Sequence, residues 1–361
     1  MARLFPQVTH RFAAREEVIR DMAGFAGLRE GEDPAYPQAL ASALLRGAVS
    51  FHDHYGWEKG GGLGAQCRKT YDPVLLASSA REAGMRAVVL RNLYFSSAGD
   101  AHLVKRMVPG IDVLGGIFLS SEIGAINPIA VETMLSYGGG IRFLCLATDS
   151  SAHTARGSGV AESTIQADPL TYVNPFTADG GVKPEMQRIL ALIAEHDILL
   201  ETGYLAPQEN LAMVRAAADA GVRRILVTHP TPWFCGMSVP EMQEAIDLGA
   251  YIEFTFIWYT HAVSYYGRRY GGNPRPELIG DAFDQIKALG AQHCVLSTDF
   301  GTIESALPVE GLRQFIFCLL DLGMTADEII AMTHTNPAWL LRLDTETTSD
   351  VNAPAPVRER V

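Results

Sequence analysis

The sequence predicts an α/β fold, a closed (β/α)8 TIM barrel, from three observations. Short runs rich in Val, Ile, Leu and Phe recur between residues 47 and 300, as in parallel strands buried on both faces. Helical patterning follows each run. The first run ends in His-x-His, where an open dinucleotide-binding sheet needs a glycine fingerprint. The expected strands are residues 47–54, 85–92, 111–119, 141–148, 197–203, 222–229, 250–258 and 293–300.

Helix start and stop signals separate these runs. Asp72 and Asn127 each precede a proline, which places a capping side chain before the first helical position. Ser238 begins a capping box, and Gly84 and Gly221 end helices just before the next strand. Three segments are expected: a helical N-terminal extension over 1–44, the catalytic barrel over 45–343 and a flexible polar tail over 344–361.

Composition narrows the class of protein. The 361 residues are 48% hydrophobic and 19% charged, which excludes disorder for the bulk of the chain. The net charge of -12 argues against nucleic acid as a partner. No run is apolar enough to span a membrane, the first residues lack the pattern of a signal peptide, and the 5 cysteines are scattered. We therefore expect a cytoplasmic protein with reduced thiols and no membrane partner.

Histidines and a carboxylate gather where the expected strands end. His52 and His54 lie two apart in the first strand, so both imidazoles point the same way and can reach one ion. His229 ends the sixth strand and Asp299 the eighth, and in such barrels reacting groups collect at these ends. The alternatives are histidines bonded to backbone and an aspartate that caps a loop. The combination favours a metal site with Asp299 as ligand or proton acceptor.

Other candidate ligands lie at similar depth. Glu201 and Glu253 interrupt apolar strands, and a buried carboxylate is costly unless it is paired or bound to a metal. A salt bridge to Arg91 is the alternative for either glutamate. Asp149 closes the fourth strand and His153 follows it, with an ordinary loop histidine as the alternative.

The seventh loop combines aromatic and basic residues. Aromatic side chains at a barrel mouth would wall a large apolar pocket, and arginines could hold the phosphates of a carrier such as coenzyme A. The alternative is a segment that packs in the core or at an interface. The expected substrate-binding residues are Phe254, Phe256, Trp258, Tyr259, Arg268, Arg269 and Arg275.

The strand-end residues His52, His54, His229 and Asp299 resemble the metal scaffold of the amidohydrolase-like barrels, over the whole barrel. More narrowly, GGIFLSSEIGAINPIAVETML, LATDSSAH, ILLETGYL, ILVTHP and NPAWLLRL are similar to a family related to those hydrolases. That family includes the nonheme diiron monooxygenase of platensimycin and platencin biosynthesis. The resemblance implies activation of dioxygen, mostly on CoA-linked substrates.

Two departures distinguish the sequence from the usual dizinc hydrolases. Tyr204 stands where these enzymes usually carry a histidine, and LATDSS lacks their strand-four lysine. Oxygen donors in place of imidazoles suit a harder, redox-active metal such as iron. Tyr204 is thus a candidate ligand or proton donor, and a tyrosine of the pocket wall is the alternative.

Two functions follow as hypotheses. The resemblance implies a diiron monooxygenase that hydroxylates a bulky apolar, diterpenoid-like CoA ester in antibiotic biosynthesis. It would use two iron ions, dioxygen and an external electron donor, because no flavin or nicotinamide fingerprint is present. The alternative is a binuclear zinc hydrolase of an amide, lactone or thioester with Asp299 as general base. A metal-binding barrel without catalysis is the least favoured, and a homo-oligomer is compatible with all three.

Overall fold

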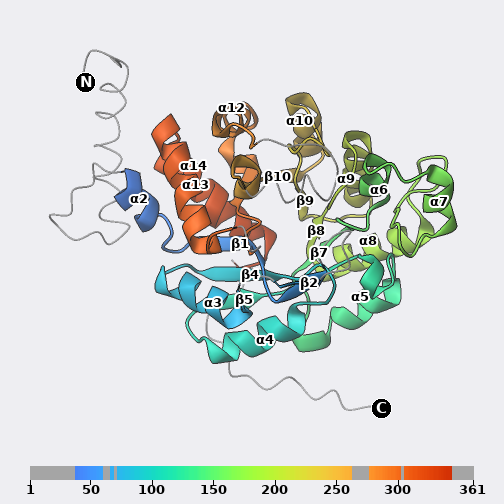
Figure 1. The fold of residues 1–361 in the computed structure, drawn as a ribbon, viewed down its shortest axis with the longest axis horizontal. Helices are drawn as coiled ribbons and strands as arrows, with labels where there is room; N and C mark the ends of the chain where they lie inside the picture. The colour runs from blue at the N-terminus through green and yellow to red at the C-terminus, as the bar shows by residue number, and fades with distance from the viewer. Residues whose placement is uncertain (1–36, 60–65, 69–70, 262–275, 302–304, 344–361) are drawn as a thin grey trace.

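A ring of parallel strands surrounded by helices forms the centre of the protein (Figure 1). The computed structural model describes residues 37–59, 66–68, 71–261, 276–301 and 305–343. The expected tail and all but the end of the expected N-terminal extension lie outside this part. The strands of the ring are β1 (Val49–His54), β4 (Ala87–Arg91), β5 (Asp112–Leu114), β6 (Gly116–Phe118), β7 (Phe143–Cys145), β8 (Leu199–Glu201), β9 (Ile225–Val227), β10 (Ala250–Thr255) and β11 (Cys294–Ser297).

The pairing of these strands confirms the predicted (β/α)8 barrel. β1, β4 and β5 pair in chain order, as do β6 to β11. A parallel bridge between Asp53 and Phe300 joins the two ends of the ring. The expected third strand divides into β5, which pairs with β4, and β6, which pairs with β7. The division falls at Gly115, where a Cβ would lie 2.5 Å from the carbonyl oxygen of Ser97.

Helices cover the outside of the ring (Figure 1). Asp72, Asn127 and Ser238 cap their helices as expected. The expected seventh strand stops at Thr255, because Phe256–Tyr259 forms the 3-10 turn η3. The helices are α2 (Pro37–Ala43), α3 (Pro73–Glu82), α4 (Ala98–Met107), α5 (Pro128–Met134), α6 (Ala152–Gly157), α7 (Glu162–Ala167), α8 (Pro184–His196), α9 (Pro207–Asp219), α10 (Val239–Asp247), α12 (Ile279–Leu289), α13 (Pro308–Leu322), α14 (Ala326–Ile330) and α15 (Asn336–Leu340).

Two apolar clusters fill the barrel. The larger one lies between the strands and the surrounding helices. The smaller one fills the interior and includes Phe51, Phe143 and Leu226 together with Leu340 and Leu341 at the end of α15. The chain after β11 therefore returns to seal the end of the barrel at which the strands begin.

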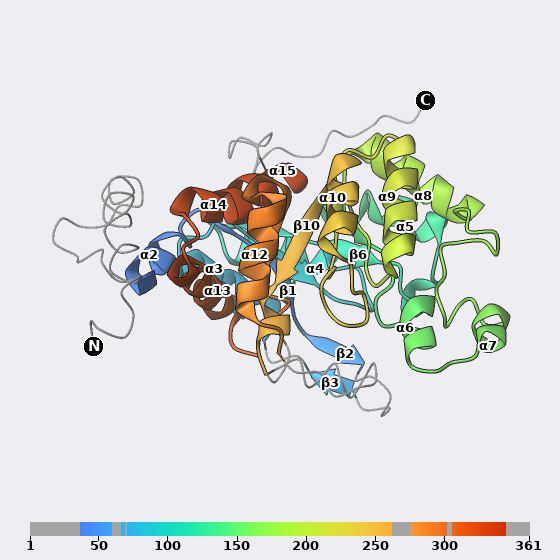
Figure 2. The same cartoon turned by 90° about the horizontal axis from the view of Figure 1, so that it is seen from above.

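An antiparallel hairpin that the sequence analysis did not predict follows β1. It consists of β2 (Trp57–Lys59) and β3 (Gln66–Arg68). Figure 2 shows this hairpin at one end of the barrel and α15 at the opposite end. Among the described residues, no helix has the length and apolar character needed to cross a membrane.

Candidate metal centre

A bulge in β1 turns two histidines into the barrel. The register against β4 shifts between Ser50 and Asp53, so β1 carries one extra residue there. Such a bulge re-aims the side chains that follow it. Phe51 packs in the apolar interior cluster, whereas His52 and His54, both buried, lie with their Nε2 atoms 3.2 Å apart. The bulge thus separates an apolar lower interior from a polar upper one.

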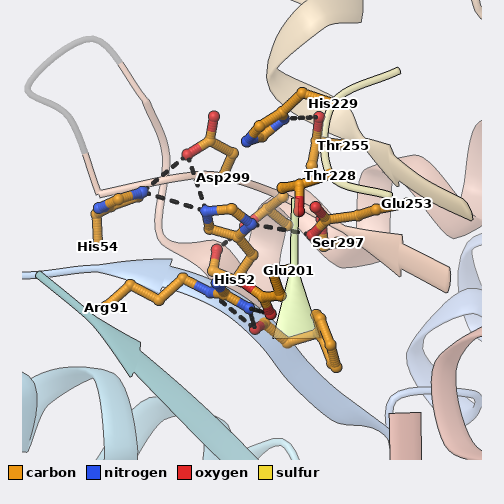
Figure 3. A network of polar contacts seen from close by, with 12 residues as sticks. His52, His54, Arg91, Glu201, Thr228, His229, Glu253, Thr255, Ser297 and Asp299 are labelled. Carbon is orange, nitrogen blue, oxygen red and sulfur yellow. Dashed lines mark hydrogen bonds and ion pairs between the residues drawn. The ribbon is translucent and has the colours of Figure 1, made fainter. Parts of the chain in front are cut away.

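Asp299 completes a group of three donors (Figure 3). Its Oδ1 lies 3.0 Å from His54 Nε2 and 3.4 Å from His52 Nε2. Asp299 has a φ of 55°, a strained conformation that often marks a functional site. The next turn also needs Gly301, because a Cβ there would lie 2.0 Å from the carbonyl oxygen of His54. Close contact between the ends of β1 and β11 therefore places the three donors together.

Glu253 fixes the orientation of His52 from β10. Its Oε1 lies 2.9 Å from His52 Nδ1 and accepts a hydrogen bond of 2.8 Å from Ser297 Oγ. Glu253 Oε1 accepts a hydrogen bond from Ser297 and accepts a second one from His52 Nδ1. The proton of His52 therefore lies on Nδ1, and its Nε2 lone pair faces His54 and Asp299. A carboxylate behind an imidazole in this way is the usual outer partner of a metal-bound histidine.

Burial sets the charge state of these groups. Burial and the nearby guanidinium of Arg91 hold the pKa of His52 well below its usual range. Burial opposes ionisation of Asp299, but the imidazoles of His52 and His54 outweigh it and keep the pKa of this carboxyl below its usual range. Burial raises the pKa of Glu253. Near neutral pH the group of three thus offers a neutral imidazole at His52 and an ionised carboxylate at Asp299.

The spacing of the three donors fits one metal ion. Ligand atoms about 2.1 Å from one ion, at angles between octahedral and tetrahedral, lie roughly 3.0–3.4 Å apart. The three separations here are 3.0, 3.2 and 3.4 Å. A second candidate group combines His52 with His229 and Glu253. It shares His52, whose Nδ1 already faces Glu253, so the His52 Nε2 lone pair serves only the first group.

His229 lies beside this group, at the end of β9. It is buried, with a φ of 51°, and its ring centroid is 5.3 Å from that of His52. The Nδ1 atom lies 3.2 Å from Thr255 Oγ1 and accepts a hydrogen bond of 3.2 Å from the indole Nε1 of Trp258. Burial lowers the pKa of His229 to about 4, so the ring is neutral near pH 7.

Glu201 forms an ion pair with Arg91 inside the barrel, which is the alternative that the sequence left open. Arg91 donates to both carboxylate oxygens, with Nη2 2.7 Å from Oε1. Its Nε and Nη2 also donate to the Phe51 carbonyl at the bulge, and Phe143 stacks 4.4 Å from the guanidinium. Burial opposes the charge of Arg91, but the Glu201 carboxylate outweighs it and raises the pKa of Arg91. Glu201 is therefore engaged by a cation of the protein itself.

The remaining candidate ligands lie outside both donor groups. His153 Nε2 lies 2.5 Å from the carbonyl oxygen of Phe234 and so ties α6 to the loop after β9. Asp149 accepts a hydrogen bond of 3.3 Å from the hydroxyl of Tyr94. Tyr204 is buried with its ring edge-on to His229, at 5.3 Å between centroids. Neither Asp149 nor His153 belongs to a donor group among the described residues.

Most of the aromatic residues expected to wall a pocket pack in the core between the barrel and its helices. Side chains alternate along β10, so Glu253 faces inward and Phe254 packs in the outer cluster. Phe256 stacks on Phe315 of α13 at 5.1 Å, and Tyr259 lies 5.6 Å from the same ring. These three predictions are corrected to core packing. Trp258 instead contacts His229, and Arg268, Arg269 and Arg275 lie outside the described residues.

Two partners of the centre, Ser297 and Thr255, were missed in the sequence. Ser297 lies two residues before Asp299, and Thr255 two residues after Glu253. Alternation along a strand places each on the same face as its neighbouring candidate. The pattern of every second residue was the signal that could have found both.

Solved structures of similar fold support the barrel assignment. An amidohydrolase from Pseudomonas aeruginosa matches with a TM-score of 0.51 and 11% identity, over 85% of this chain and 98% of its own. Dipeptidase AC, a metallopeptidase, matches with a TM-score of 0.52 and 13% identity, and the match covers 82% of this chain and 98% of the dipeptidase. An amidohydrolase from Burkholderia multivorans matches with a TM-score of 0.51 and 11% identity, and the match covers 82% of this chain and 99% of that protein. At these identities the likeness establishes an amidohydrolase-like fold.

Sequence comparison places the chain in a family. Among proteins of curated function, none matches it. A model of a family of unknown function, DUF6282, matches residues 61–253, more than half of the chain. The match includes His229 and Glu253, while His52, His54 and Asp299 flank it. The chain therefore belongs to the DUF6282 family.

Proposed function

We propose that the protein is a metal-dependent hydrolase of an amide, lactone or thioester. The observation that carries the proposal is the buried group of His52, His54 and Asp299, whose donor atoms are spaced for one ion. Solved structures of like fold include an amidohydrolase and a dipeptidase, which favours hydrolysis over oxygenation. A divalent ion such as zinc would supply Lewis acidity and make water a stronger nucleophile at neutral pH.

The protein's own groups have distinct parts in this reaction. His52 and His54 would hold the ion through Nε2, with Glu253 keeping the proton of His52 on Nδ1. The Asp299 carboxylate, ionised at neutral pH, would complete the ligand set through Oδ1, and it would also take a proton from the attacking water and return it to the leaving group. Burial of all these groups excludes bulk water and strengthens each electrostatic contact.

The test is turnover by protein loaded with one metal at a time. We expect zinc-loaded protein to hydrolyse members of a panel of amides, lactones and thioesters, CoA thioesters included, equally well with and without oxygen. Asp299→Asn should lower kcat by about 10³-fold or more, the size of effect expected when a general base is removed. Asp149→Asn is the matched control and should keep both metal and activity. An inactive zinc protein across the panel would contradict the proposal.

A diiron monooxygenase is the second candidate. The observation that favours it is Tyr204, which packs against His229 where the related hydrolases usually place another imidazole. It predicts two coupled irons per chain, visible in Mössbauer spectra, that oxidise when oxygen is admitted. Oxygen uptake with an apolar CoA ester and an external reductant would establish this candidate. Tight zinc, no oxygen response and hydrolytic turnover would exclude it.

A further inference from the structure

The environment of His229 Nδ1 determines which ring nitrogen carries the proton. The indole Nε1 of Trp258 lies 3.2 Å from this atom. An indole N–H can only donate, so it needs an acceptor opposite, and Nδ1 must present its lone pair. Trp258 is 1% exposed, so its hydrogen bond to His229 is shielded from bulk water. The threonine hydroxyl 3.2 Å from the same nitrogen can rotate to suit.

The proton of the neutral ring therefore lies on Nε2. A protonated ring nitrogen has no lone pair to offer an ion. In Figure 3 the ring nitrogen of His229 that is not bonded to Thr255 points toward Asp299, on the side of the donor group. An N–H donor thus faces the place where chemistry at that group would occur. The opposite arrangement holds at His52, where Glu253 keeps the proton on Nδ1 and leaves Nε2 bare.

We infer that His229 is a hydrogen-bond donor to the substrate's carbonyl oxygen and not a metal ligand, with its Nε2–H tautomer held by the indole of Trp258. The role in catalysis rests on the proposed hydrolase function. As the carbonyl carbon becomes tetrahedral, its oxygen gains negative charge, and a preorganised N–H stabilises that charge more than the ground state. This role differs from the metal ligand that the sequence analysis expected of His229.

Zinc binding separates the two roles of His229. We expect His229→Gln to bind the same single zinc per chain as the wild type, with a Kd changed by less than about threefold. The matched control His54→Gln should lose zinc by 100-fold or more, since it removes a ligand. Loss of a zinc equivalent, or a Kd raised tenfold or more, in His229→Gln would overturn the inference.

The tautomer can be observed directly. Two-bond ¹H–¹⁵N spectra of the zinc-loaded protein, with the His229 signals identified by their absence in His229→Gln, should show the pattern of a neutral Nε2–H ring. A pattern with the proton on Nδ1 and zinc at Nε2 would overturn the inference. Trp258→Phe should let the His229 pattern move toward a mixture of tautomers, and the wild-type spectrum decides even if that variant does not fold.

Once a substrate has been found, steady-state kinetics tests the catalytic role of His229. His229→Gln should lower kcat by about 10²-fold or more with little change in KM, the effect of removing one oxyanion donor. An unchanged kcat would overturn the catalytic role. Failure of the hydrolase proposal would look different: the wild type would not hydrolyse the panel, while zinc content and tautomer would still report on His229.

Discussion

Two buried groups of charge inside the barrel differ in how the protein balances them. Arg91 and Glu201 lie below His52 in the view of Figure 3 and neutralise each other, with the guanidinium also bonded to the Phe51 carbonyl. Above them, His52, His54 and Asp299 bring possible ligand atoms within 3.4 Å of one another. The lower pair is complete as folded, whereas the upper group gains most from an added cation. Burial alone therefore does not decide whether a group of charged side chains is already balanced by the protein.

The largest expected effect is loss of metal from the upper group. His52→Ala combined with His54→Ala removes two of three donors, so zinc affinity should fall by at least about 10³-fold. The circular dichroism spectrum should stay that of a folded barrel, because the apolar interior does not include these rings. Equilibrium dialysis with metal analysis measures the loss, and exposed His102→Ala is the control. Zinc retained by the double variant would remove the basis for the comparison.

The lower pair should control stability. Arg91→Met leaves Glu201 as a buried charge without its partner, which typically costs about 3–5 kcal/mol of unfolding free energy. Urea unfolding of the metal-free protein measures this cost. The double variant Arg91→Met, Glu201→Leu should recover most of it, since replacing both charges by apolar groups is often neutral. A double variant as unstable as the single one would show that the bulge, and not charge balance, needs Arg91.

A half-buried carboxylate outside both groups, Glu277, sharpens the contrast. Burial raises the pKa of Glu277 to about 7, and its Oε2 accepts a hydrogen bond of 3.0 Å from Thr231. Because the folded-state pKa exceeds the unfolded value, the folded protein binds the extra proton, and stability falls as pH rises from about 4.5 to about 7. Relative to Glu277→Gln, the unfolding free energy of the wild type should fall by up to about 3 kcal/mol between pH 5 and pH 8, as measured by urea unfolding. If the difference in unfolding free energy between the wild type and Glu277→Gln were the same at both pH values, this prediction would be contradicted. The exposed substitution Glu244→Gln is the control, and it should leave the pH dependence unchanged.

Residues at strand ends could be predicted from the sequence because position along the chain fixes their height in a barrel. His52, His54, His229 and Asp299 lie together for that reason. Which carboxylate meets Arg91 could not be predicted, because Glu201 and Glu253 interrupt similar apolar strands and only packing across the barrel distinguishes them. The direction of Phe254 was available in principle: once Glu253 is assigned inward, alternation sends its neighbour outward.

The partners of side chains outside the strands could not be predicted, for a physical reason. Strand and helix patterns indicate local burial, whereas His153, which lies in the short helix α6 after the fourth strand, takes its partner from a loop far along the chain. The same holds for Trp258, whose indole meets His229 from a turn that the sequence suggested was strand. The tautomer of a histidine depends on such contacts and has no signature in the sequence.

The helix that seals the barrel has a consequence for biosynthesis. Leu340 and Leu341 are among the last described residues, yet they pack with Val49 and Phe51 of the first strand. Ring closure likewise waits for Phe300 to meet Asp53. During translation, the apolar floor of the barrel stays open until nearly all of the described chain has left the ribosome. Native closure is thus a late, long-range event, and until then the growing chain exposes apolar surface that the folded barrel buries.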